Sequence, residues 1–184
     1  MQQLATPDEL LAQLAEKLKT LLEDKAIDNP LMVGIHTGGV WVATRLHQQL
    51  NDTDNLFSEP LATLDISFYR DDFSRIGINP EVKPSQLPPD VDDRHIILVD
   101  DVLHTGRTIR AAMNELFDYG RPASITLVCL IERDGRELPL QADIVGAHIK
   151  LDAGEHIKLT GPEPLAFELQ QAQNGNNKNA AKEQ

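Results

Sequence analysis

Residues 97–108 read ILVDDVLHTGRT, and this stretch is the most informative one about the fold. Together with Ile96, its first three residues form a run of four apolar residues that leads directly into Asp100 and Asp101, and the turn TGRT follows at 105–108. Carboxylates at the end of a buried apolar run are costly unless a ligand, a metal or hydrogen bonds satisfy them. Ligands of open α/β sheets bind beyond the carboxyl ends of the strands. We therefore predict a strand over 95–99, with the acid pair just after it at the mouth of a sheet.

The turn at 105–108 has the features of a binding site for a phosphate monoester. Backbone N–H groups at a helix start lack partners within the helix, Gly106 permits close approach, and two threonine hydroxyls add donors. Adjacent carboxylates on opposite faces of a strand suit a sugar diol, a metal–phosphate assembly, or both. The stretch therefore predicts a pocket for a phosphorylated sugar, with hydroxyls on Asp100 and Asp101 and phosphate on the turn.

Each half of this pattern also occurs in proteins of different function. Threonine is an ordinary helix cap, and an acid pair after a strand also opens phospho-receiver domains. A receiver places its acid pair near the start of the domain, whereas only residues 102–184 follow Asp101. The nucleotide-binding motifs G-x-x-x-x-G-K-[ST] and G-x-G-x-x-G are absent from the sequence. The combination of strand, acid pair and turn is more specific than either half.

Helix and strand patterns alternate along the rest of the chain. Thr6, Pro7 and Glu9 predict the start of a helix with leucines on one face. Further elements are expected as helices over about 40–50 and 109–117, and as strands over 31–35, 61–69, 124–131 and 142–149. This order indicates an α/β protein with a mostly parallel sheet and helices on both faces.

Three segments lack these patterns. Residues 51–55 are predicted to be a short loop. The proline-rich stretch 70–93 is long for a connector, and it is either a functional lid or a variable surface loop. Residues 172–184 are polar and low in complexity, which predicts a disordered tail. We therefore expect a single domain over residues 1–171.

The composition and net charge of the chain disfavour some classes of function. With 184 residues, 41% of them apolar and 25% charged, the chain has the composition of a soluble globular protein. No apolar stretch approaches the roughly 18 residues of a membrane span, and no signal segment is visible, so we expect a cytoplasmic protein without a membrane role. A net charge of −12 opposes binding to nucleic acid but permits small phosphorylated ligands. Cys129 is expected to be a buried hydrophobic residue rather than a nucleophile.

HIILVDDVLHTGRT (95–108) resembles the phosphoribosyl-diphosphate (PRPP) binding signature of type I phosphoribosyltransferases. The blocks at 32–46, 64–74 and 120–146 resemble more narrowly the bifunctional pyrimidine-operon regulator/uracil phosphoribosyltransferase family, PyrR. The resemblance implies the type I fold, a mostly parallel twisted sheet flanked by helices, with a small hood and a flexible lid loop. It implies transfer of phosphoribosyl from PRPP to uracil, giving UMP and pyrophosphate with Mg²⁺ as cofactor. It also implies a homo-oligomer, a dimer or a tetramer.

Residue roles follow from the same resemblance. PRPP and nucleotide binding falls on Asp100, Asp101, Val102, Leu103, His104, Thr105, Gly106, Arg107 and Thr108. In this run the acid pair would hold the ribose hydroxyls, partly through Mg²⁺-bound water, and His104 to Thr108 would hold the 5′-phosphate. The pyrophosphate loop would be Thr37, Gly38 and Gly39.

The lid and the hood are assigned in the same way. The lid, about 70–93, would begin at Tyr69, Arg70, Asp71 and Asp72, with Arg70 as a candidate cation on pyrophosphate or a solvent-exposed arginine. The hood, about 131–167 together with the N-terminal segment, would include Arg133 and Arg136 and would read the base. The candidate catalytic residues are Asp100, Asp101, His104 and Arg70.

The chain departs from the family pattern at several positions. Gly38 stands where many members carry arginine, so the pyrophosphate loop lacks a cation. His104 stands where tyrosine is frequent, and it is either a proton relay from uracil N1 or part of the pocket wall. Gln141 and Ala147 replace an arginine and a lysine of the RNA-binding members, which disfavours RNA attenuation. RNA binding stays an alternative, because Arg133, Arg136 and Lys150 lie nearby in the sequence. The alternatives are a non-catalytic regulator that senses UMP or PRPP and a transferase for a purine base.

Overall fold

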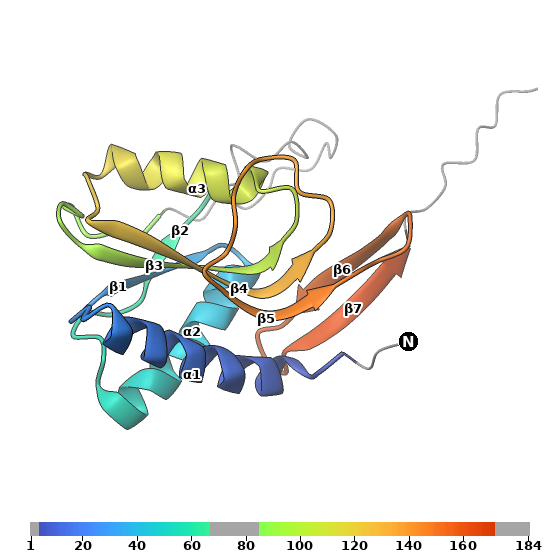
Figure 1. Cartoon of the computed structure of the whole chain (residues 1–184), viewed down its shortest axis with the longest axis horizontal. Helices are drawn as coiled ribbons and strands as arrows, with labels where there is room; N and C mark the ends of the chain where they lie inside the picture. The colour runs from blue at the N-terminus through green and yellow to red at the C-terminus, as the bar shows by residue number, and fades with distance from the viewer. Residues whose placement is uncertain (1–3, 67–84, 172–184) are drawn as a thin grey trace, which may run out of the picture.

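The computed structural model describes residues 4–66 and 85–171 of the chain (Figure 1). The helices within these residues are α1 (Pro7–Asp24), α2 (Gly38–Asp54) and α3 (Arg107–Asp118). The strands are β1 (Leu31–Ile35), β2 (Ala62–Leu64), β3 (His95–Leu103), β4 (Ser124–Arg133), β5 (Ile144–Ile149), β6 (Glu155–Thr160) and β7 (Ala166–Gln171). A five-stranded parallel sheet has the order β2-β1-β3-β4-β5, and β6 and β7 form a separate antiparallel pair. The predicted α/β class with a parallel sheet is confirmed.

Helices cover both faces of the central sheet, as the alternation along the chain predicts. α1 and α2 lie on one face and α3 lies on the other (Figure 1). Successive strand residues point to opposite faces, so Ile97 and Val99 of β3 join the cluster under α1 and α2, whereas Ile96 and Leu98 join the cluster under α3. The sheet is therefore buried on both sides, which explains why its strands read as nearly continuous apolar runs.

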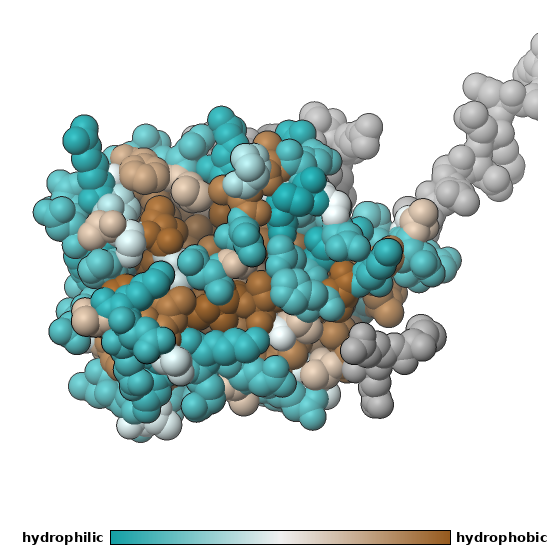
Figure 2. All heavy atoms as spheres, in the orientation of Figure 1, coloured by the Kyte–Doolittle hydropathy of each residue, from teal (hydrophilic) through white to brown (hydrophobic). Residues whose placement is uncertain are grey.

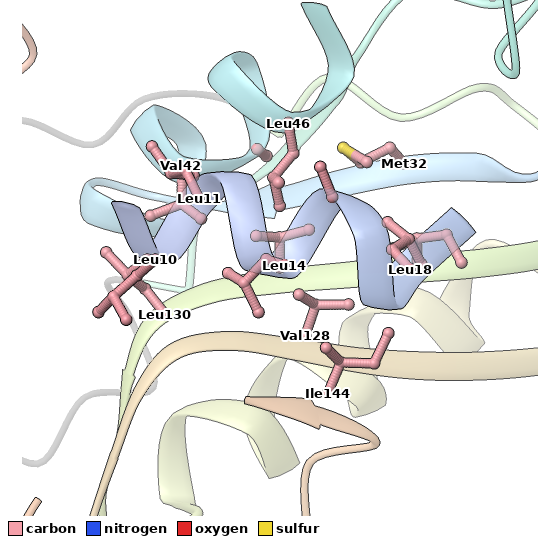
Figure 3. Close-up of a cluster of buried hydrophobic side chains, with 14 of the residues drawn as sticks. Leu10, Leu11, Leu14, Leu18, Met32, Val42, Leu46, Val128, Leu130 and Ile144 are labelled. Carbon is pink, nitrogen blue, oxygen red and sulfur yellow. The ribbon is translucent and has the colours of Figure 1, made fainter. Parts of the chain in front are cut away.

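The first helix begins where its capping signal predicts. The Thr6 side chain accepts a hydrogen bond from the N–H of Glu9 at 3.3 Å, and the Glu9 carboxylate accepts one from the N–H of Thr6 at 2.8 Å. Leu10, Leu14 and Leu18 then pack onto α2 and the sheet (Figure 3). Reciprocal capping fixes the start of α1, and the leucine face fixes its orientation.

Two predicted boundaries around α2 and β2 differ from the structure. The predicted loop at 51–55 is wrong, because α2 continues to Asp54 and ends on Asn55 in the left-handed conformation (φ 52°). Asparagine tolerates this conformation and is a regular helix terminator. Of the predicted strand 61–69, β2 covers Ala62–Leu64, and residues 67–69 lie outside the described part.

The β6–β7 hairpin was not predicted from the sequence. Ile157 and Leu159 alternate with polar residues along β6, which is a strand pattern. Both pack into the core cluster beneath α1 and α2, together with Leu165 in the connection to β7. The hairpin lies beside the end of the sheet (Figure 1), where β6 contacts β3.

The view in Figure 2 shows a largely hydrophilic surface with a hydrophobic band between α1 and β5. A groove of about 820 Å³ follows this line. Within it, the Lys17 ammonium donates to the Val145 carbonyl of β5 at 2.8 Å. A lysine placed in this way protects the open edge of the sheet from pairing with another strand. No helix in the described ranges is long and apolar enough to cross a membrane.

Candidate active site

The acid pair lies inside β3 rather than after it. The predicted end of the strand at 99 is wrong by four residues, because β4 continues alongside and supplies partners up to the pair Leu103↔Glu132. Asp100 pairs with Cys129 in this register, and its side chain is buried with 3% exposure. Asp101 is half-buried. The two acids therefore project from a rigid central strand, which holds their positions more firmly than a loop would.

Tertiary packing brings the acid pair against the turn that opens α2. A Cβ added to Gly38 would lie 2.4 Å from the Asp101 carboxylate carbon, and one added to Gly39 would lie 2.6 Å from the Val99 carbonyl oxygen. The same Cβ on Gly39 would be 3.2 Å from Oδ1 of Asp100. We call Gly38 and Gly39 the glycine turn. Only glycine leaves room for both carboxylates at this distance, so the predicted pyrophosphate loop and the predicted ribose site adjoin.

The electrostatics at this junction favour anions on the α2 side. The helix N-terminus carries partial positive charge and backbone N–H groups without partners in the helix. Thr37 precedes the helix, is exposed, and makes no side-chain cap. Oδ1 of Asp100 accepts a hydrogen bond from the N–H of Asp101 at 3.0 Å. An anionic ligand at Thr37 and the glycine turn would therefore lie directly beside two carboxylates, an arrangement that suits a ligand with both a phosphate and a hydroxyl or metal.

The phosphate loop, residues 104–108, leaves the same strand. Gly106 is the N-cap of α3 and has φ 91°, a conformation in which other residues are strained. The Thr105 hydroxyl accepts from the N–H of Arg107 at 3.2 Å, so it supports the first turn of the helix. Thr108 is half-exposed in that turn. Residues 104–108 therefore lie at a helix N-terminus, a position that favours anions, and phosphate binding there stays a prediction.

Two residues of the predicted PRPP-binding run have side chains in the hydrophobic clusters. Leu103 is buried with 1% exposure in the cluster under α3, and Val102 packs against the cluster on the opposite face. Both side chains pack in the core because they continue the alternation of β3, so a contact with PRPP stays a prediction for their backbone groups only.

His104 is the first residue of the phosphate loop, and its side chain lies against the chain that follows β4. A Cβ on Gly135 would be 2.7 Å from Nε2 of His104, so the imidazole rests on that glycine. Burial lowers the pKa of His104, and the neighbouring charges of Arg133 and His156 lower it further. The imidazole is thus neutral at neutral pH, which leaves the choice between a proton acceptor and a pocket wall open.

The two arginines predicted for the hood make different contacts. Arg133 Nη1 lies 3.3 Å from Nδ1 of His156, and Nε of Arg133 is buried with no hydrogen bond to the described residues. Arg136 donates through Nη1 to the His104 carbonyl and through Nη2 to the Glu132 carboxylate. Tyr69, Arg70, Asp71 and Asp72 fall outside the described residues.

Sequence reasoning missed two acids beside the phosphate loop. Glu132 is held by Arg136, and the Glu137 carboxylate accepts from Nε of Arg107 at 2.8 Å. Their only signal in the sequence is proximity to Arg133 and Arg136, because charge alone does not separate an exposed acid from one that orients a cation.

Comparison with known proteins assigns the chain to a family. The sequence profile of the phosphoribosyl transferase domain matches residues 2–161. The Bifunctional protein PyrR of Nitrosococcus oceani is 61% identical over 163 residues, which are 89% of this chain and 90% of that protein. The Bifunctional protein PyrR of Pseudomonas putida is 55% identical over 167 residues, 91% and 94% of the two chains. The chain belongs to the PyrR family of phosphoribosyltransferases.

Solved structures agree with this PyrR assignment at the level of fold. The hypoxanthine phosphoribosyltransferase of Trypanosoma cruzi has a TM-score of 0.60 and 21% identity, and the match covers 83% of each chain. The purine phosphoribosyltransferase of Pyrococcus horikoshii has a TM-score of 0.54 and 22% identity, covering 79% of this chain and 82% of the other. The expected type I phosphoribosyltransferase fold is therefore confirmed, while these distant relatives say nothing about the base.

Proposed function

We propose that this chain is a uracil phosphoribosyltransferase, which converts uracil and PRPP to UMP and pyrophosphate. The observation that carries the proposal is the contact between the acid pair of β3 and the glycine turn, with the phosphate loop leaving the same strand. One ligand with a ribose, a 5′-phosphate and a pyrophosphate matches these three neighbouring features. The high identity to PyrR proteins supports the choice of a pyrimidine base.

Each part of PRPP has a proposed partner. Asp100 and Asp101 hold the ribose hydroxyls, since ionised carboxylates accept strong hydrogen bonds. The backbone and hydroxyls of His104 to Thr108 hold the 5′-phosphate. Thr37 and the glycine turn hold pyrophosphate at the N-terminus of α2, where the helix dipole favours negative charge.

The donor set fits Mg²⁺ bound together with the substrate. Mg²⁺ usually takes one or two carboxylates, several waters and the phosphates of a substrate. Asp100 and Asp101 supply two carboxylates, and the described residues contain no group of three or more histidine, cysteine or acidic side chains that would bind a metal alone. When held there with PRPP, the ion would supply positive charge that offsets the negative charge of pyrophosphate.

The reaction forms a bond from uracil N1 to C1′ of the ribose and breaks the bond from C1′ to pyrophosphate. Positive charge develops on the ribose and negative charge on pyrophosphate. Asp100 and Asp101 stabilise the first, and the N–H groups at the start of α2 stabilise the second. His104, as a neutral imidazole, is available to accept the N1 proton. The lid residues Tyr69–Asp72, the hood boundaries and the tail stay predictions.

The decisive experiment measures UMP and pyrophosphate formation from uracil and PRPP with Mg²⁺. We expect turnover that ceases with EDTA and falls strongly in Asp101→Asn. Absence of turnover at millimolar substrate would refute the proposed enzymatic activity and favour the alternative, a non-catalytic regulator that senses UMP or PRPP. Competition among uracil, hypoxanthine and guanine tests the base, and preference for a purine would overturn the choice of uracil.

A regulatory role in pyrimidine gene expression is the second proposed function, because the PyrR relatives carry the name bifunctional protein. Attenuation through RNA is disfavoured by Gln141, Ala147 and the net charge of −12. Retention of pyrimidine-operon leader RNA at low salt tests it. A homo-oligomer is also expected, and sedimentation checks this.

A further inference from the structure

Two loops leave neighbouring parallel strands at the same edge of the sheet. The phosphate loop follows β3, and the segment 134–140, which we call the brace loop, follows β4. The two strands pair up to Leu103↔Glu132, directly before both loops begin. The sheet therefore places the brace loop beside the phosphate loop, although about 30 residues separate the two along the chain.

The brace loop contacts the phosphate loop residue by residue. The His104 ring rests on Gly135, and the His104 backbone carbonyl accepts a hydrogen bond from the Arg136 guanidinium. The Thr105 carbonyl accepts from the N–H groups of Glu137 and Leu138 at 3.0 and 3.1 Å.

These contacts continue into the first turn of α3. The Cα of Gly106 faces Leu138 and Leu140, whose nearest carbons would be 3.4 and 3.5 Å from an added Cβ. Arg107 pairs with Glu137 at 2.8 Å. The brace loop thus contacts residues 104, 105 and 107 and lies beside Gly106.

The carbonyl contacts determine which way the next N–H groups point. The peptide bonds from 104 to 106 are trans, and in a trans peptide the C=O and N–H of one unit point to opposite sides. A His104 carbonyl held toward Arg136 therefore turns the Thr105 N–H away from the brace loop. In the same way, the held Thr105 carbonyl turns the Gly106 N–H to the opposite side.

We propose that Arg136 is a positioning residue of the phosphate loop, which holds the His104 carbonyl so that the Thr105 N–H points at the 5′-phosphate of the substrate. This inference rests on the proposed function, because that function supplies the phosphorylated ligand. It gives Arg136 a role distinct from reading the base.

The surroundings of Arg136 argue against a direct contact with phosphate. One guanidinium nitrogen donates to the His104 carbonyl and another to Glu132, so two of its donors are already occupied. Glu132 is 17% exposed and lies 3.1 Å, through its second oxygen, from Nδ1 of His148. A cation neutralised by a well-shielded acid is suited to holding a backbone rather than to attracting an anion.

The test compares UMP with uridine, which lacks the phosphate, in calorimetric and NMR titrations of the full chain. Arg136→Ala should weaken the binding of UMP by about tenfold or more, the loss expected for one charge-assisted hydrogen bond. The affinity for uridine should not change. The UMP affinity of Arg136→Lys should lie between those of the wild-type protein and Arg136→Ala. His148→Ala is the matched control, because it removes the outer contact of Glu132 and leaves Arg136 in place.

Glu132→Ala separates positioning from direct binding. Removal of a negative charge near a phosphate strengthens anion binding on electrostatic grounds alone. Positioning through Glu132 and Arg136 predicts the opposite, a several-fold weaker UMP complex. Tighter UMP binding by Glu132→Ala, unchanged UMP binding by Arg136→Ala, or an equal loss for uridine and UMP would each overturn the proposal.

A second readout needs no substrate. In the ligand-free protein, Arg136→Ala should shift the ¹H–¹⁵N signals of Thr105 and Gly106, whereas His148→Ala should not. If Arg136→Ala is folded and these signals do not move, the proposal is overturned. If the wild-type protein fails to bind UMP, the proposed function fails, and these amide signals still test the brace loop separately.

Discussion

Alanine at the two residues of the glycine turn should have different consequences, mainly on stability at Gly39 and mainly on PRPP affinity at Gly38. Neither Gly38 nor Gly39 has positive φ, so alanine is allowed by the backbone, and only the neighbouring atoms decide its effect. A methyl group on Gly39 meets the Val99 carbonyl oxygen at 2.6 Å, where ordinary contact needs about 3.4 Å. Because Val99 lies in the central strand, that oxygen cannot move, and α2 must shift. We expect Gly39→Ala to lower the free energy of unfolding by about 1–3 kcal/mol.

At Gly38 the methyl group meets a side chain instead. It would lie 2.4 Å from the Asp101 carboxylate, which can rotate away, and 2.9 Å from the Asp101 Cβ, which moves only together with β3. We therefore expect Gly38→Ala to lower the free energy of unfolding less than Gly39→Ala does, by about 1 kcal/mol. Its affinity for PRPP should fall roughly tenfold to a hundredfold, the equivalent of a lost hydrogen bond from a charged group at about 1.5–3 kcal/mol.

Each variant is the control for the other. Urea unfolding can be followed through the fluorescence of Trp41, the single tryptophan of the chain, which lies in α2. The KM for PRPP at saturating uracil reports the site. Wild-type PRPP affinity in Gly38→Ala, or wild-type stability in Gly39→Ala, would show that the acid pair and the glycine turn are not in contact.

Three further predictions concern the core, the first cap and pH. Leu14→Ala should cost about 2–5 kcal/mol in chemical unfolding, because Leu14 is fully buried; a cost below about 1 kcal/mol would contradict its packing. Thr6→Ala should cost about 1 kcal/mol, and Glu9→Ala should add little to it, since the two residues form one capping box; full additivity would refute the box. Burial lowers the pKa of His104, so the unfolded state binds this proton first and stability falls as pH drops from about 6.5 toward the folded pKa. His104→Gln should flatten unfolding midpoints over that window, and its pH–rate profile decides the relay: an unchanged profile removes it.

Local signals in the sequence were sufficient where neighbouring residues alone decide structure. The capping residues of α1, the apolar run of β1 and the glycine before α3 depend on nearby chain, and each was predicted. Predictions failed where a distant partner decides. The extension of β3 through the acid pair depends on the length of β4, and β6 is stable because its apolar residues reach a core built largely by α1 and α2.

The candidate site divides in the same way. The chemistry proposed for it rests on the sequence, because an acid pair after an apolar run and a glycine-containing turn at a helix start are both set by residues in direct succession. Tertiary packing was needed to show that the glycine turn adjoins the acid pair and that the brace loop supports the phosphate loop. Those contacts join segments far apart in the chain, and they form because parallel strands bring their carboxyl ends to one edge of the sheet.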